Sequence, residues 1–237
     1  MTPGHLGARS RLLLSTVLVL LLVLLWDVVG LDLTMARLAG GPNGFPLSDD
    51  PTLVLWLHEI PRFLSWFGLT LLVVAIRWPF ALLRRLTRRE RIQLTLTVLA
   101  SVIAISLLKN SSRTSCPWDL AEFGGTARYV SHWAWAVHDG GPGRCFPAGH
   151  ASAAFAYLGG WFVLRRSMPR AAWAWFVTAA CLGMVLGLAQ QWRGAHYMSH
   201  TLWTAWVCWV TGLAVDAAFH RGRPVSAPHS TPKLNEG

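Results

Sequence analysis

The sequence predicts an all-α fold, a polytopic membrane helical bundle with about six transmembrane helices. Hydrophobic residues make up 53% of the 237 residues and charged residues only 14%, which is too apolar for an ordinary soluble domain. Six apolar segments are each long enough to be a span, which takes roughly 20 residues of helix. The net charge of +10 does not indicate a nucleic-acid partner, because soluble nucleic-acid binders do not carry such repeated apolar runs.

The expected spans lie, in chain order, at 12–31, 62–83, 92–108, 150–164, 171–189 and 201–219. The first span follows two arginines as a signal peptide would, but it is long and lacks a clear small-residue cleavage site, so we expect an uncleaved anchor. Residues 1–222 then form one membrane domain. The polar, Pro-containing segment 223–237 is expected to be a disordered tail.

The second span has the weakest pattern. Pro61 and Arg62 open it, and Arg77 interrupts its apolar run. We expect a short interfacial helix over 52–60 to precede it.

The orientation follows from the positions of the 21 lysines and arginines. Most of them fall in the N-terminal tail, in the turns at 77–91 and 165–170, and in the C-terminal tail. By the positive-inside rule, both termini face the cytoplasm. The loop 109–149 and the stretch "RGAHYMSH" at 193–200 are therefore expected on the outer side.

The loop 109–149 is the one long polar insertion, and its Gly and Pro clusters predict irregular backbone. Cys116 and Cys145 lie near its two ends. If the outer compartment is oxidising, a disulfide between them would join these ends. His132 and His138 are expected to be exposed loop residues.

Three clusters of cationic and histidine side chains are expected on the outer side. Charged groups close to a membrane are costly unless they serve a site, and cations around histidines suit a phosphate. The clusters are Lys109 with Arg113, His150 in "FPAGH", and Arg193 with His196 and His200.

In "FPAGH", Gly149 allows the backbone to approach a ligand closely. His150 begins the fourth span, where free N–H groups of a helix N-terminus face an oxyanion and where an acid can protonate a leaving oxygen. A Pro-Gly turn with a capping histidine is an equally open interpretation.

In "RGAHYMSH", a helical backbone would put Arg193, His196 and His200 on one face. One histidine can then attack phosphorus while the arginine neutralises phosphate charge. Two alternatives remain open. The i, i+4 histidines can form a zinc pair, although no Glu or third ligand accompanies them, or they can be unrelated residues at a helix end.

These motifs resemble the type 2 phosphatidic acid phosphatase superfamily over about 109–204. That family has a Lys, six residues and Arg-Pro, then Pro-Ser-Gly-His, then Ser-Arg, five residues, His, three residues and Asp. Here the matching stretches are "KNSSRTSCP", "PAGH" and "AQQWRGAHYMSH". The register that also aligns Gly194, Tyr197 and Ser199 makes His196 the nucleophile.

Five positions depart from the family pattern: Cys116 for Arg, Ala148 for Ser, Ala189 for Ser, Gln190 for Arg and His200 for Asp. The resemblance implies that His196 attacks, that His150 protonates the leaving group and that His200 stands in the partner position of the nucleophile. Asp119 or Glu122 is an alternative source of the missing carboxylate. Phosphate binding is expected from Lys109, Arg113, Arg193 and backbone near Gly149, without a metal or other cofactor.

The motifs look most like a bacterial membrane branch of the superfamily. They imply a lipid phosphatase or phosphotransferase of the inner membrane with a periplasmic site. Its substrate would be a lipid phosphate or pyrophosphate such as undecaprenyl pyrophosphate, and its acceptor water or lipid A. The main alternative is a non-catalytic membrane protein that binds or transports an anionic lipid, and a structural partner in envelope assembly is a weaker one.

Overall fold

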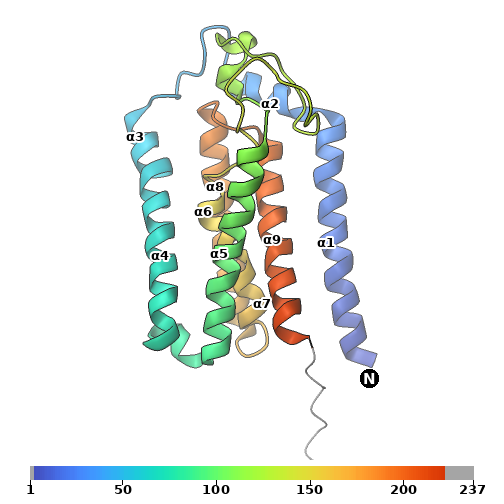
Figure 1. Cartoon of the computed structure of the whole chain (residues 1–237), viewed down its shortest axis with the longest axis vertical. Coiled ribbons are helices and arrows are strands. Elements are labelled where there is room, and N and C mark those ends of the chain that lie inside the picture. The colour runs from blue at the N-terminus through green and yellow to red at the C-terminus, as the bar shows by residue number, and fades with distance from the viewer. Residues whose placement is uncertain (1–2, 222–237) are drawn as a thin grey trace, which may run out of the picture.

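The computed structural model describes residues 3–221, and every regular element in that part of the chain is a helix (Figure 1). The long helices run side by side, and the start of α1 (Pro3–Val29) lies at the same end as the last turn of α9 (Met198–His220). We call this end the terminal end, and the opposite one the loop end. The predicted tail 223–237 lies outside the described residues.

Five helical segments are long and apolar enough to cross a membrane, so the protein is a multi-pass membrane protein and the predicted fold class is confirmed. They correspond to α1, the α3–α4 region, α5 (Arg88–Ser111), α8 (Pro169–Trp192) and α9. Thr87 begins α5 with a capping box, in which its hydroxyl accepts from the Glu90 N–H and its own N–H donates to the Glu90 carboxylate.

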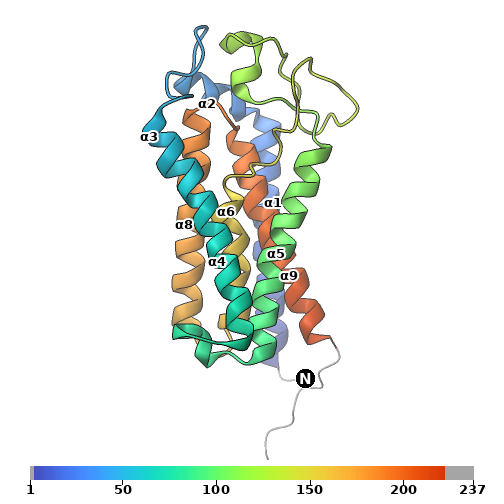
Figure 2. The same ribbon diagram turned by 60° about the vertical axis from the view of Figure 1, so that its left-hand side comes forward.

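The expected span at 150–164 is a shorter, broken helix at the centre of the bundle (Figure 2). It consists of α6 (Ser152–Phe155), a 3₁₀ turn η5 (Ala156–Gly159) and α7 (Gly160–Leu164). Most of its residues are buried by the longer helices. A Cβ at Gly159 would lie 2.1 Å from Cγ2 of Thr97 on α5, so only glycine permits this close approach.

The expected separate interfacial helix at 52–60 is wrong. The chain is helical without a break from α3 (Pro51–Val54) through a π-helical turn η1 (Leu55–Glu59) into α4 (Ile60–Arg77). Asp50 caps the start of this run, and Pro61 lies inside it, directly after the π-helical turn, where the hydrogen-bond pattern of the α-helix is already interrupted. Arg77 ends α4 rather than interrupting a span, and the 3₁₀ turn η2 (Ala81–Arg85) follows.

At the loop end, a short helix α2 (Leu31–Ala39) that sequence reasoning missed holds the start of α9. The Asp32 carboxylate on α2 accepts from the backbone N–H of Ser199, 3.0 Å away, and thereby caps α9 from another element. Asp27 at the end of α1 accepts from Trp203, and its carboxylate lies 3.4 Å from Nε2 of His132. His132 is therefore buried, contrary to the expectation of an exposed loop residue.

The loop between α5 and α6 covers the loop end with irregular backbone, as predicted (Figure 2). It contains two 3₁₀ turns, η3 (Pro117–Asp119) and η4 (Ala121–Phe123). A small apolar core beneath it includes Phe45, Phe123 and Tyr197, which joins the loop to the segment between α8 and α9. The loop is thus packed in place above the helices.

The terminal end contains a buried carboxylate, Asp216 of α9, whose side-chain partners come from two other parts of the chain. Its oxygens accept from Arg165 and Arg166 just after α7, at 3.0–3.1 Å, and from Gln93 of α5 at 2.8 Å. We call these four residues the Asp216 cluster. It ties α5, α7 and α9 together.

Candidate active site

Two histidines from distant parts of the sequence face each other at the loop end of the bundle. His150 lies in the turn before α6, and His196 lies in the segment between α8 and α9. Nδ1 of His150 is 3.4 Å from Nε2 of His196, and His196 is only 1% exposed. The residues that the sequence proposes for attack and for proton donation are therefore direct neighbours.

A cavity of about 280 Å³ opens beside His150. Its wall includes Lys109 from the last turn of α5, Gly149 and His150, together with His58 and Arg62 from the η1–α4 run. A Cβ at Gly149 would lie 3.6 Å from Nζ of Lys109, so glycine keeps the space beside this ammonium group clear. The expected grouping of Lys109, Gly149 and His150 is thus present in one place.

The electrostatics of the cavity favour an anion. Burial, together with smaller contributions from nearby groups, first His58 and then Lys109, lowers the pKa of His150 to about 3. Burial also lowers the pKa of His196 well below its usual range. Both imidazoles are therefore neutral near pH 7. Within residues 3–221, Lys109 forms no ion pair, so its charge is available to a ligand.

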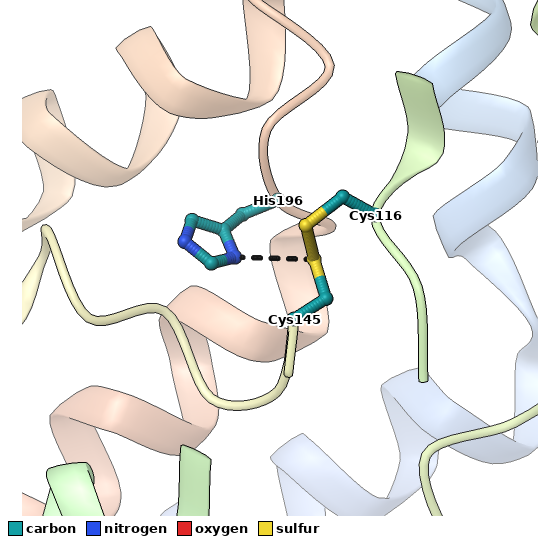
Figure 3. Close-up of side chains that lie close together, drawn as sticks. All are labelled: Cys116, Cys145 and His196. Carbon is teal, nitrogen blue, oxygen red and sulfur yellow. Dashed lines mark hydrogen bonds between the residues drawn. A yellow bond between two sulfur atoms is a disulfide. The ribbon is translucent and has the colours of Figure 1, made fainter. Parts of the chain in front are cut away.

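The disulfide between Cys116 and Cys145, which the sequence left as a conditional possibility, is present, with the two Cα atoms 5.1 Å apart. It lies directly against His196, and Sγ of Cys145 is 3.5 Å from Nδ1 of the imidazole (Figure 3). The two cysteines and His196 have the donor types of a zinc site, but metals bind thiolates rather than disulfide sulfur. The closed disulfide therefore acts here as a neutral neighbour of the imidazole.

His200 does not contact His196 in the way that the family's Asp would. Nδ1 of His200 lies 3.0 Å from the carbonyl oxygen of Cys145 and donates to it, since a carbonyl can only accept. The ring centroids of His196 and His200 are 5.9 Å apart, and no hydrogen bond joins the two rings. His200 therefore holds the backbone at Cys145 instead of orienting the nucleophile.

The two alternative carboxylates also have other partners. Asp119 accepts from the backbone N–H of Cys116 at 3.0 Å, and Glu122 forms an ion pair with Arg37. In the described part of the chain, no carboxylate forms a hydrogen bond with His196. The missing carboxylate of the family pattern is thus not replaced through space.

The predicted helical face of Arg193, His196 and His200 is wrong. α8 ends at Trp192, and α9 begins only at Met198. Gly194 breaks the helix with a φ of +74°, and a Cβ there would lie 2.4 Å from the ring of Phe45. The same break removes the i, i+4 geometry of the proposed zinc pair.

Arg193 is absent from the cavity wall, but it lies near His150 and its guanidinium is held by three hydrogen bonds. Its Nε and Nη2 donate to the carbonyl oxygen of Ser48 at 3.0 and 2.7 Å, and its Nη1 donates to Oε1 of Gln190 at 3.0 Å. Three of its five N–H bonds are thus used within the protein, and the charge lies close enough to lower the pKa of His150. Gln190 stands where the family has an arginine, and its side chain here helps to position Arg193.

Arg113 is not brought to the cavity. Its side chain is exposed in the loop and is absent from the cavity wall. The reason is local, because Ser112 already leaves the helix and its backbone oxygen bonds the N–H of Arg144, which directs the chain away from Lys109. Its position does not support the expected role in phosphate binding.

Sequence reasoning missed His58. Its ring centroid is 4.2 Å from that of His150, and its Nδ1 is 2.8 Å from the Glu59 carboxylate. The available signal was a histidine next to a glutamate in the apolar stretch "LWLHEIP", which had been expected at the membrane interface. A second histidine therefore lines the cavity beside His150.

Comparison with known protein families places these residues in context. A family model described as the PAP2 superfamily matches residues 91–223, which is over half of the chain and contains both facing histidines. No curated protein and no solved structure matches the chain. Members of the superfamily are phosphatases, which agrees with a cationic cavity beside a pair of neutral histidines. The chain thus belongs to the PAP2 superfamily and is a phosphatase-type enzyme of the membrane.

Proposed function

We propose that the protein is a membrane lipid phosphatase or phosphotransferase that acts through a phosphohistidine. The observation that carries this proposal is that the cationic cavity adjoins an apolar groove of about 810 Å³ between α4 and α8. The two spaces share Leu57, Pro61, Ser65 and Ala153. A ligand that fills both has a phosphate at one end and a hydrocarbon chain at the other, as a lipid phosphate or undecaprenyl pyrophosphate does.

In the first step, the lone pair on Nε2 of His196 attacks phosphorus, and the bond from phosphorus to the leaving oxygen breaks. His150 gives its proton to that oxygen. In the empty site the low pKa of about 3 leaves His150 neutral. The negative charges of a bound phosphate oppose the effect of Lys109 and Arg193, so substrate binding raises the pKa of His150, which then takes up from water the proton that it gives to the leaving oxygen.

In the second step, an acceptor oxygen forms a new bond to phosphorus while the bond to Nε2 of His196 breaks. With water as the acceptor, His150 takes the proton and phosphate is released. With a lipid A phosphate as the acceptor, the phosphoryl group is transferred instead. The same two histidines serve both outcomes.

Three groups are assigned to phosphate binding in this mechanism. Lys109 supplies the unpaired positive charge, and the open backbone at Gly149 lets the phosphate approach it. Arg193 has two N–H bonds left for the phosphate after those to Ser48 and Gln190. His200 supports the site indirectly through the Cys145 carbonyl.

We assign the enzyme to a bacterial inner membrane, with both termini in the cytoplasm and the site facing the periplasm. The arginine-rich turns at 77–91 and 165–170 lie at the terminal end, which supports this orientation. A disulfide at the loop end is also what an oxidising compartment permits.

The test is phosphate release from undecaprenyl pyrophosphate by purified protein in detergent, with and without lipid A as acceptor. We expect His196→Ala and His150→Ala each to lower kcat by about 10²-fold or more. His138→Ala, at an exposed loop histidine, is the matched control and should retain full activity. A soluble phosphate ester without a hydrocarbon chain should be a much poorer substrate.

Equal activity of the His196→Ala and His138→Ala proteins would disprove the mechanism. The departures from the family pattern, above all the lack of a carboxylate at His196, favour one second candidate, a membrane protein that binds an anionic lipid without turnover. Saturable binding of the lipid with no product in any protein would support that candidate.

A further inference from the structure

The nitrogen of His196 that points away from His150 faces a disulfide where the family pattern has a carboxylate. Nδ1 of His196 is 3.5 Å from Sγ of Cys145 (Figure 3). Nε2 of His196 is 3.4 Å from Nδ1 of His150. Both His196 and Cys145 are buried, at 1% and 0% exposure. The partner of the nucleophile is therefore a sulfur atom that water does not replace.

The bonding capacity of that sulfur determines which nitrogen of His196 carries the proton. A disulfide sulfur has no hydrogen, so it can only accept a weak hydrogen bond. This favours the tautomer in which Nδ1 of His196 carries the proton and Nε2 keeps its lone pair. Nδ1–H of His150 can then donate to Nε2 of His196, which is consistent with the 3.4 Å distance. Only this tautomer can attack phosphorus from the cavity side.

We propose that the Cys116–Cys145 disulfide is the positioning group of His196, and that the enzyme is active only while this disulfide is closed. The inference rests on the proposed attack by His196. It gives the disulfide the orienting task of the family's carboxylate, without the negative charge.

Reduction would change the partner of His196 from an acceptor into a donor. A dithiol supplies two electrons and two protons, breaks the bond between the sulfurs and itself becomes a disulfide. Cys116 is only partly buried, so a reductant has a route to the bond. The new Cys145 thiol can donate to Nδ1 of His196 or to the Ala195 oxygen, 3.3 Å from the sulfur. If the thiol donates to Nδ1 of His196, the ring proton of His196 lies on Nε2, and the lone pair needed for attack is lost.

Three cysteine variants separate this role from simple loop closure. Cys116→Ala opens the disulfide and leaves the Cys145 thiol beside His196, whereas Cys116→Ala/Cys145→Ala opens it and leaves no sulfur donor. Cys181→Ala removes an exposed free thiol elsewhere and is the control for the reductant. We expect reduced wild type and Cys116→Ala to lose kcat about tenfold or more with little change in KM, up to the roughly 10⁴-fold known for a wrong histidine tautomer.

The double variant should retain more activity than Cys116→Ala, because neither tautomer of His196 is favoured in it. If the disulfide only closes the loop, the two variants lose activity equally. That result, or an unchanged kcat after mass spectrometry shows complete reduction of the wild type, would overturn the proposal.

A second measurement does not depend on any substrate. Nitrogen-15 spectra of histidine-labelled protein, with His196 assigned through His196→Gln, report which ring nitrogen carries the proton. We expect a protonated Nδ1 in the oxidised protein and a population with protonated Nε2 after reduction. A protonated Nε2 in the oxidised protein would contradict the proposal even if the phosphatase activity is confirmed. The expected tautomer without turnover would leave the positioning intact and refute the proposed function.

Discussion

The two ends of the bundle each contain a buried polar cluster, and the clusters differ in how their charges are balanced. At the terminal end, the Asp216 carboxylate is surrounded by Arg165, Arg166 and Gln93, and its two oxygens are occupied by donors. At the loop end, Lys109 has no ion pair among the described residues, and its neighbours His150 and His196 are neutral. One cluster is complete without a ligand, whereas the other has an excess of positive charge.

The difference indicates the task of each cluster. A buried charge with all its partners joins the elements that supply them, and removing one partner leaves the others uncompensated. A buried charge without a partner raises the free energy of the empty protein, and a bound anion lowers it again. The Asp216 cluster therefore holds helices together, while the cationic cluster at the loop end is suited to binding an anion.

Among the variants that test this difference between the two ends, Lys109→Met is expected to have the largest effect. This change removes the unpaired charge but keeps a side chain of similar length, so kcat/KM should fall by about 10²- to 10³-fold. Because this half-buried charge has no described partner, the free energy of unfolding should stay equal or rise. Phosphate release from the lipid substrate and thermal unfolding in detergent give the two values. A clear loss of stability would show that Lys109 is balanced inside the protein after all.

Asp216→Asn tests the opposite end. The amide leaves Arg165 and Arg166 without a counter-charge, but these side chains are 26% and 41% exposed, so water offsets part of the loss. We expect the free energy of unfolding to fall by about 1–3 kcal/mol, with unchanged kcat per folded molecule. Glu122→Gln, which breaks the exposed pair with Arg37, is the matched control and should cost less than about 1 kcal/mol. A large loss of kcat at constant folded fraction would contradict the structural role.

The helices could be predicted because apolar runs and arginine-rich turns are local signals. Five of the expected spans correspond to helical segments long enough to cross a membrane. The central helix at 152–164 is shorter and is surrounded by the longer helices. Its length depends on this packing, which cannot be read from the sequence of one segment. The uninterrupted run from Pro51 to Arg77 was missed because a proline and charged residues within a helix resemble a helix boundary in the sequence.

The site residues that belong to sequence motifs could be predicted. The positions of side chains that are held by backbone carbonyl groups could not. Lys109, Gly149, His150 and His196 do meet. The placement of Arg193 depends on a carbonyl of Ser48, and that of His200 on a carbonyl of Cys145, which side-chain patterns do not reveal. The exposed position of Arg113 likewise follows from where α5 ends.

The pH dependence of stability should separate the neutral histidines from the Asp216 cluster. The pKa of His150 is about 3 in the folded protein and near its ordinary value when unfolded, so below about pH 6.5 the unfolded chain binds the extra proton. Stability is therefore present near pH 7 and is lost as the pH falls, by about 1.4 kcal/mol per pH unit for this histidine.

Thermal unfolding of the wild type and His150→Gln between about pH 7 and pH 5 provides the measurement, and the variant should show the shallower slope. Trp135→Phe, an exposed loop change without a titrating group, is the control. Inorganic phosphate should also make the wild-type slope shallower, because the bound anion raises the pKa of His150. Identical slopes for wild type and His150→Gln would contradict the buried neutral histidine.

The smallest expected effect comes from a pair of glycines, one in each environment. At Gly149 an added Cβ would be 3.5 Å from Cδ of Lys109, an ordinary contact, so Gly149→Ala should leave stability unchanged or raise it by about 0.4–1 kcal/mol. The methyl group would nevertheless take space beside the ammonium group, and KM should rise a few-fold. Gly159→Ala would bring Cβ to 2.1 Å from Thr97 and should lower stability without changing KM. If Gly149→Ala left KM unchanged, the phosphate would have to approach Lys109 from the side of the cavity at His58. The Gly149 backbone would then have no role in phosphate binding.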